Sequence, residues 1–146
     1  MFTFATDYFI MVTVASAGTI QFAAASAGLR GLLFLRTKAR AQALGIVLIV
    51  VGLGLFFGTE DRNINDYEGG LDANIQSLLF FLGTVAGFGL TVVISSLLNI
   101  QMTRGDAQPE EGLDALRHTN FVTVVRLNIG YWRRNWRTQT KRYFSG

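Results

Sequence analysis

Few residues of this chain could carry out chemistry by themselves. The sequence has one histidine and no cysteine, so disulfides, cysteine nucleophiles and thiolate metal sites are excluded. His118 lies beside Arg117 and near Asp114, but no nucleophile with a positioned base accompanies it, and we interpret it as an exposed polar residue. A single histidine also cannot hold a haem between two helices. We therefore predict no catalytic residue and no enzymatic activity.

A group of acidic residues between positions 60 and 72 is the only candidate cation site. Its members are Glu60, Asp61, Asp66, Glu68 and Asp72. They lack the D-x-D-x-D-G spacing with a distal glutamate that a calcium loop requires. We predict no metal site and interpret the segment as a solvated loop or a docking surface, with a turn at Gly69-Gly70 before the next helix.

Amide side chains are the remaining polar groups in otherwise apolar surroundings. Gln21 lies within a long uncharged segment, where its amide must find a partner. We expect a bond to a neighbouring helix, with contact to a quinone, pigment or substrate as the alternative. Asn99 and Gln101 fall at the end of another such segment, where water could satisfy them. We predict no bound cofactor and no small-molecule substrate.

Three uncharged segments must position these side chains: residues 8–29, 41–59 and 73–103. A helix of about 20 apolar residues crosses the hydrocarbon of a bilayer. We therefore predict an all-α membrane protein with three transmembrane helices at about 8–29, 41–59 and 77–98. A soluble domain with three buried helices is the alternative, but a domain this small could not bury so much apolar surface.

A signal peptide is a second interpretation of residues 8–29, because Ala25-Ser26-Ala27 has the small-x-small pattern of a cleavage site. The residues before Tyr8 carry no positive charge, and the apolar stretch is longer than a usual signal sequence. We expect this segment to be retained as the first helix.

The charges between the segments predict the topology. Arg30, Arg36, Lys38 and Arg40 lie in the first connection without an acid, whereas the second connection is acidic. The tail carries eight bases, so 12 of the 13 lysines and arginines fall on one side. Because short basic loops stay in the cytoplasm, we predict an integral protein of the cytoplasmic (inner) membrane, with the N-terminus outside and the tail in the cytoplasm.

Small and polar residues recur at helical spacing on two of the predicted helices. The first helix carries Thr13, Ala17, Gln21, Ala24 and Gly28, and the third carries Gly83, Gly87, Thr91 and Ser95. Since lipid provides no hydrophobic force between helices, close packing depends on such residues. We predict two packing faces, used within the chain's own bundle, against neighbouring subunits, or both. The second helix, rich in large aliphatic residues, is expected to face lipid over most of its circumference.

The tail combines aromatic and basic residues. Pro109, Glu110 and Glu111 indicate the start of a short helix ending near His118, and Thr119-Asn120 could cap a second helix over residues 121–144. We predict that this amphipathic segment contacts anionic lipid headgroups or a partner protein. The residues concerned are Arg126, Trp132, Arg133, Arg134, Trp136, Arg137, Lys141 and Arg142. A strand at 122–127, nucleic-acid binding and a solvated tail are the alternatives, and we predict no nucleic acid.

These features predict two parts, a three-helix transmembrane domain (1–103) and a cytoplasmic basic amphipathic tail (104–146). We interpret the chain as a non-catalytic accessory or structural subunit of a larger integral membrane complex, with a bioenergetic complex as a candidate host, whose partners are other integral membrane subunits. The alternative is a homo-oligomeric, transport-related protein with a pathway lined by Gln21, Thr13, Thr91 and Ser95. A lipid-modifying enzyme is a weaker third interpretation, because only His118 and scattered tail carboxylates could serve it.

Overall fold

The computed structural model describes residues 4–58, 72–104, 112–126 and 128–129, without the side chains of residues 103, 104 and 112. Every regular element in these ranges is helical. The elements are α1 (Phe4–Ala27), η1 (Arg30–Leu32), α2 (Lys38–Gly58), α3 (Ala73–Leu98), η2 (Ile100–Arg104) and η3 (Gly112–Arg117). A further helical turn covers residues 121–126.

The three long helices confirm the predicted helical class, and each is long and apolar enough to cross a membrane. At about 1.5 Å per residue, the 24 residues of α1, 21 of α2 and 26 of α3 exceed the roughly 30 Å of bilayer hydrocarbon. They begin three to four residues earlier than predicted, because polar first turns extend them beyond the uncharged core of each segment.

Side chains and backbone explain where these helices begin and end. Asp72 caps α3, since its Oδ1 accepts a hydrogen bond from the Asn74 backbone N–H at 3.2 Å. Gly28 ends α1 with a φ of 75°, and Leu29 N–H donates to the Ala24 carbonyl at 2.9 Å, the pattern of a Schellman cap. A Cβ on Gly28 would meet no described atom of this chain within 4 Å, so this glycine serves the cap and makes no close contact with another helix of the chain.

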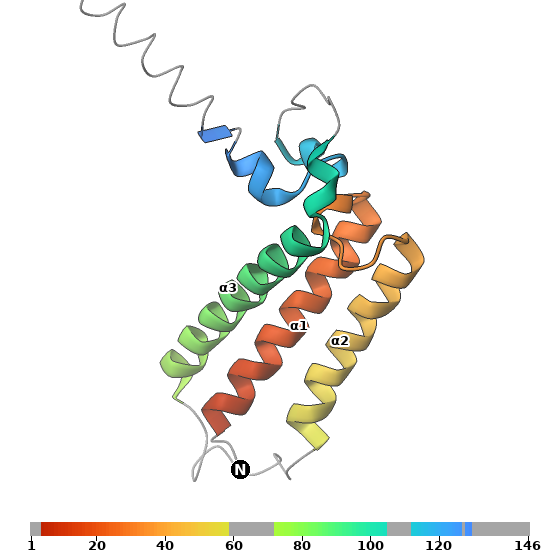
Figure 1. The fold of residues 1–146 in the computed structure, drawn as a ribbon. Coiled ribbons are helices and arrows are strands. Elements are labelled where there is room, and N and C mark those ends of the chain that lie inside the picture. Colours follow the sequence, from red (N-terminus) through yellow and green to blue (C-terminus); the bar gives the residue numbers. More distant parts are fainter. Residues whose placement is uncertain (1–3, 59–71, 105–111, 127, 130–146) are drawn as a thin grey trace, which may run out of the picture.

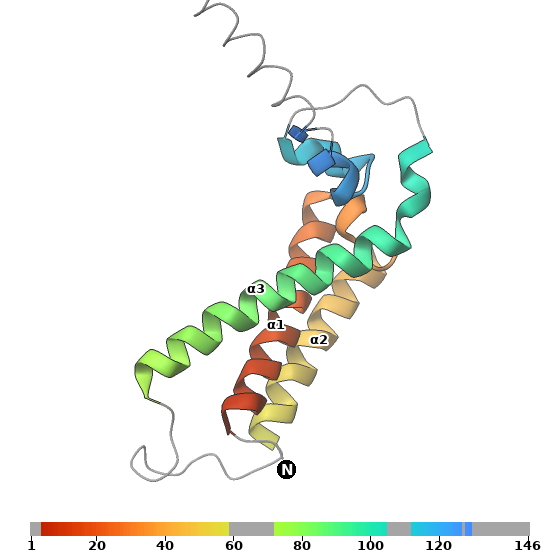
Figure 2. The ribbon, with the colours of Figure 1, turned by 60° about the vertical axis from the view of Figure 1, so that its left-hand side comes forward.

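Helix α1 lies between α2 and α3 (Figure 1). It packs against both, whereas α2 and α3 form no extensive contact with each other in the described part of the chain. A view from another side shows α3 crossing α1 obliquely (Figure 2). The bundle is therefore open, with α1 covered on two sides by its neighbours.

Glycines allow the close approach at both helix crossings. A Cβ on Gly18 would lie 2.6 Å from the Gly45 carbonyl oxygen, and one on Gly45 would lie 2.7 Å from the Gly18 oxygen. At the other crossing, a Cβ on Gly87 would lie 2.6 Å from the Thr13 oxygen, and one on Gly83 would lie 2.9 Å from the Val12 side chain. The α1–α2 crossing thus depends on a glycine pair that the four-residue spacing did not reveal.

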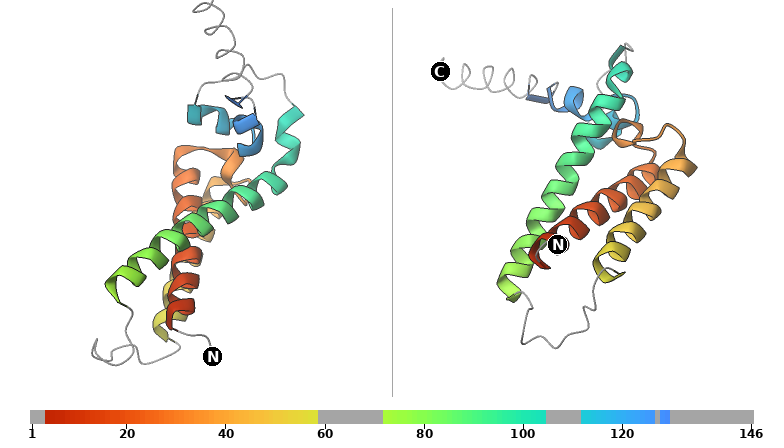
Figure 3. Two further views of the ribbon diagram at one scale, coloured as in Figure 1. Left: turned by 90° about the vertical axis from the view of Figure 1, so that its left-hand side faces the viewer. Right: turned by 60° about the horizontal axis from the view of Figure 1, so that its bottom comes forward.

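The described start of the tail packs on one end of the bundle, where the α1–α2 connection lies (Figure 3). Leu116 of η3, 1% exposed, joins a hydrophobic cluster with Ala25, Leu32 and Leu33. Phe121 stacks edge-on against Phe88 of α3 with 6.0 Å between ring centroids. The bundle and the first part of the tail therefore share a core at this end.

The tail differs in detail from its predicted structure. The described part of the predicted short helix is a 3-10 helix, η3, and not an α-helix. Asn120 accepts a hydrogen bond from the Thr123 N–H at 2.8 Å, as an N-cap does, and residues 121–126 are helical, so the strand alternative for this segment is wrong. Residues 130–144 of the predicted amphipathic helix lie outside the described residues.

Candidate functional site

Gln21 is fully buried, and its amide holds the α1–α2 connection. Its Nε2 donates to the Leu32 carbonyl at 2.8 Å, and its Oε1 accepts from the Phe34 N–H at 2.9 Å. The expected bond to a neighbouring helix is therefore wrong in detail, because the partner is the connecting segment. An irregular backbone at the edge of a membrane needs such partners, since lipid cannot satisfy its polar groups.

Asn99, at the end of α3, also bonds to the backbone of the α1–α2 connection. Its Nδ2 donates to the Leu33 carbonyl at 2.8 Å and to the Ser95 carbonyl at 2.9 Å. With 9% of its surface exposed, it is not left to water as the sequence suggested. Gln21 and Asn99 together satisfy backbone groups of three consecutive residues, 32–34, and we call this pair of side chains the amide clamp. It joins the ends of α1 and α3 to the connection.

Hydroxyl groups inside the bundle bond to their own helices. Thr13 Oγ1 donates to the Phe9 carbonyl and Thr91 Oγ1 to the Gly87 carbonyl, each at 2.8 Å, while Ser95 Oγ donates to the Val92 carbonyl at 3.2 Å. All three residues are buried between helices. These three hydroxyls therefore donate their protons to the backbone of their own helices, whereas Ser96 Oγ, buried on the same part of α3, has no hydrogen-bond partner among the described residues.

The other predicted packing residues occupy related positions. Ala24 is buried and Ala17 half-buried, with the Ala17 N–H 3.2 Å from the position of a Cβ on Gly87. Thr13 and Ala17 meet Gly87 across the α1–α3 crossing, whereas Gln21 and Ala24 face the connection and its hydrophobic cluster. The predicted packing face on α1 is therefore divided between a contact with α3 and a contact with the α1–α2 connection.

Within the described ranges, no three histidine or acidic side chains gather as a metal site would require. Of the acidic loop residues, only Asp72 falls in these ranges, and it caps α3; Glu60, Asp61, Asp66 and Glu68 lie outside them. Arg117 Nε donates to Asp114 Oδ1 at 2.9 Å, so the two charged neighbours of His118 pair with each other. His118 itself is exposed.

A groove of about 450 Å³ runs along α1 between α2 and α3. It is lined by seven residues of α1, one of α2 and two of α3: Tyr8, Met11, Val12, Ala15, Ser16, Thr19, Ile20, Leu53, Phe80 and Thr84. The hydroxyls of Thr19 and Thr84 donate to carbonyls of their own helices, at 2.9 and 2.8 Å, so the groove is mainly apolar, with small side chains of α1 among larger aromatic and aliphatic ones. We call it the α1 groove. It is the opening that remains because α2 and α3 do not pack together.

Only one of the predicted headgroup residues, Arg126, lies in the described part of the tail, and it is exposed. The others lie outside that part; they are Trp132, Arg133, Arg134, Trp136, Arg137, Lys141 and Arg142.

Comparison of the chain with protein-family models, with curated proteins and with solved structures gives no match. What the chain does has to follow from its fold and side chains.

Proposed function

We propose that this chain is a non-catalytic structural subunit of a larger integral membrane complex. The observation that carries the proposal is the α1 groove, which leaves the small-residue helix open to the bilayer between α2 and α3. Small side chains favour close approach of another helix over contact with acyl chains. A transmembrane helix of an unlike subunit is the occupant that fits this shape and chemistry.

The polar groups inside the bundle support a structural role. Transport and proton relay usually leave an ionisable residue within the bilayer, and the described helices carry none between Tyr8 and Ala27, between Ala41 and Gly58, or between Ala73 and Leu98. The amide clamp and the hydroxyls of Thr13, Thr91 and Ser95 are bonded to backbone carbonyls or N–H groups of this chain, whereas Ser96 Oγ is buried and has no hydrogen-bond partner among the described residues. The polar side chains described here thus stabilise the fold.

We further propose that the chain lies in the cytoplasmic membrane with its tail inside. Arg30, Arg36, Lys38 and Arg40 lie at or beside the helix ends that the tail covers, and short basic connections stay in the cytoplasm. The tail would then fix the depth of the subunit by resting its bases and aromatic residues among anionic headgroups or on a partner.

The burial of the polar residues disfavours a homo-oligomeric transport protein. That alternative needs Gln21, Thr91 and Ser95 along a shared pathway, yet all three are fully buried and bonded within the chain. A pathway between copies would have to be lined by the outer faces of the helices, which carry large apolar side chains.

Native electrophoresis in mild detergent tests the proposal with a matched pair of variants. Thr19→Phe fills the α1 groove, whereas Val47→Phe adds a ring to the outward face of α2, where Val47 is 54% exposed. We expect the wild type and Val47→Phe to migrate with unlike subunits and Thr19→Phe to be released as a smaller species. A uniform homo-oligomer in all three samples would contradict the proposal.

A further inference from the structure

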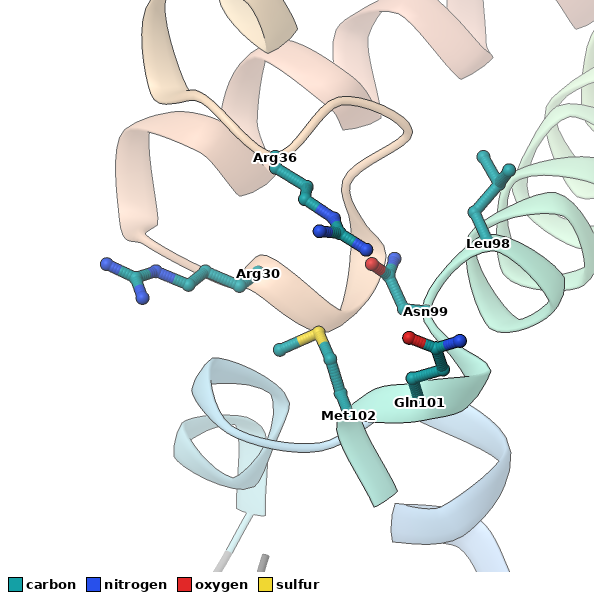
Figure 4. Close-up of a pocket in the computed structure, with 6 residues that line it drawn as sticks. All are labelled: Arg30, Arg36, Leu98, Asn99, Gln101 and Met102. Carbon is teal, nitrogen blue, oxygen red and sulfur yellow. The ribbon is translucent and has the colours of Figure 1, made fainter. Parts of the chain in front are cut away.

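A second cavity lies where the α1–α2 connection meets the end of α3. It has a volume of about 340 Å³ and is lined by six residues: Arg30, Arg36, Leu98, Asn99, Gln101 and Met102. Figure 4 shows these side chains, which come from η1, the following connection, the end of α3 and η2. We call this cavity the arginine pocket. The sequence prediction used its two arginines only for topology.

The lining is cationic and holds no carboxylate. Among the described residues neither guanidinium forms an ion pair, and the acid of the nearby η3, Asp114, is paired with Arg117. The Arg36 guanidinium points toward the Asn99 side chain, while Arg30 extends away from it (Figure 4). Arg36 is therefore the arginine placed to contact a molecule inside the pocket, and Arg30 lies at its rim.

The Asn99 half of the amide clamp links the two sides of the arginine pocket. Asn99 commits its Nδ2 to the Leu33 and Ser95 carbonyls, and Leu33 belongs to the connection that carries Arg36. The Asn99 side chain on one side of the pocket is thus bonded directly to the backbone of the connection on the other, at 2.8 Å. Gln101, which is exposed, adds an amide whose N–H groups can donate.

The position of the pocket matches the boundary between hydrocarbon and headgroups. Arg30 follows the end of α1 by three residues, Arg36 precedes α2 by two, and Leu98 is the last residue of α3. Leu98 and Met102 supply an apolar side next to the cationic one. A free inorganic anion needs no such apolar surface, whereas the glycerol and acyl chains of a phospholipid can contact it.

We propose that the arginine pocket binds the phosphate of an anionic membrane phospholipid. Arg36 pairs with two phosphate oxygens through its planar guanidinium, Gln101 donates to a further oxygen, and Leu98 and Met102 contact the glycerol and the first acyl carbons. This site is separate from the tail, and it depends only on the bundle spanning a membrane and not on the proposed role as a subunit.

Lipid titration of the purified full-length protein in neutral detergent tests the site. Bound phosphatidylglycerol and phosphatidylcholine are counted by native mass spectrometry for the wild type, Arg36→Gln and Arg40→Gln. Arg40 is exposed on the first turns of α2 and does not line the pocket, so its variant loses the same charge nearby. The loss in Arg40→Gln therefore measures how much the removal of one nearby positive charge weakens binding without removing a pocket contact.

We expect Arg36→Gln to weaken phosphatidylglycerol binding by about 20-fold or more, because it removes a bidentate charge-assisted contact as well as a charge. Arg36→Lys, which keeps the charge, should retain only part of the affinity. Equal losses for Arg36→Gln and Arg40→Gln would overturn the proposal, since they would indicate general attraction to a basic surface.

A competition experiment separates a lipid from a soluble ligand. If millimolar inorganic phosphate or glycerol phosphate displaces the bound lipid from the wild type, the pocket is a site for a soluble anion and the lipid assignment is wrong. Persistence of the lipid under phosphate supports it. Thermal unfolding in lipid-free detergent should be the same for all variants; a lower midpoint for Arg36→Gln alone would show that Arg36 supports the fold, which would also overturn the assignment.

Discussion

Replacing Gln21 by leucine removes one half of the amide clamp while keeping a side chain of similar size. The change deletes two hydrogen bonds, one from the buried Leu32 carbonyl and one from the Phe34 N–H, which is only partly buried. The connection between α1 and α2 should then open more readily, because of the two side chains of the clamp only Asn99 still bonds to it, and the hydrophobic cluster around Leu32 and Leu33 supplies the remaining contacts.

The size of the effect follows from the groups left behind. A buried donor or acceptor that loses its partner costs roughly 1 to 3 kcal/mol, so two such groups would destabilise the bundle by about 2 to 6 kcal/mol. Water that reaches the end of the bundle reduces this figure, and interhelical bonds in membrane proteins average about 0.6 kcal/mol each. We therefore expect a loss of about 2 kcal/mol, or roughly 30-fold in the folding equilibrium.

The absence of cysteine makes the assay direct. A single reporter, Leu33→Cys, placed at a buried position of the connection on the wild-type, Gln21→Leu and control backgrounds, reports local opening through its rate of thiol labelling in detergent. Thermal unfolding gives the accompanying change in stability. The matched control is Gln42→Leu, because Gln42 Nε2 donates only to the exposed Ser26 hydroxyl at 3.1 Å.

We expect labelling to be faster and the unfolding midpoint lower in Gln21→Leu, with Gln42→Leu close to the wild type. Equal behaviour of the two variants would refute the reasoning, since it would mean that the clamp contributes no more than a surface hydrogen bond.

Three further predictions concern the helix crossing, the core at the end of the bundle and a helix cap. Gly45→Leu should prevent the close approach of α1 and α2 and lower the free energy of unfolding by more than about 2 kcal/mol in denaturant, because a Cβ at this position would lie 2.7 Å from the Gly18 carbonyl oxygen. Gly54→Leu is the control, since a Cβ on Gly54 meets nothing within 4 Å and stability should change little; equal losses in the two variants would contradict the crossing. Leu116→Ala should cost about 2 to 5 kcal/mol if η3 belongs to the core, measured in the same way. Asn120→Ala should remove an N-cap and weaken the following turn by about 1 kcal/mol, seen as faster hydrogen exchange at residues 122–126; unchanged exchange would contradict the cap.

The helices themselves could be predicted from the sequence, because an uncharged segment of about 20 residues has few alternatives. The repeat of Gly83, Gly87, Thr91 and Ser95 could also be read from the sequence, and all four residues are buried in the chain. These features depend on local composition and helical period, and a single sequence contains both.

The contacts between segments could not be derived in the same way. Gly18 and Gly45 meet because of the angle at which α1 and α2 cross, and no periodic pattern in the sequence reports that angle. The bonds of Asn99 to Leu33 and of Gln21 to Leu32 require a connection that folds back over the bundle. Gly28 was assigned to a packing face on its spacing, although a glycine at the end of a helical segment is also typical of a C-terminal cap.

The proposed role can be tested most directly by photo-crosslinking in native membranes. A photoreactive residue at position 19 lies in the α1 groove, and one at position 47 lies on the outward face of α2. If the chain is a structural subunit, position 19 should form a defined adduct with an unlike membrane protein, and position 47 should label mainly lipid. Adducts from position 19 with lipid alone, or with a second copy of this chain, would contradict the account.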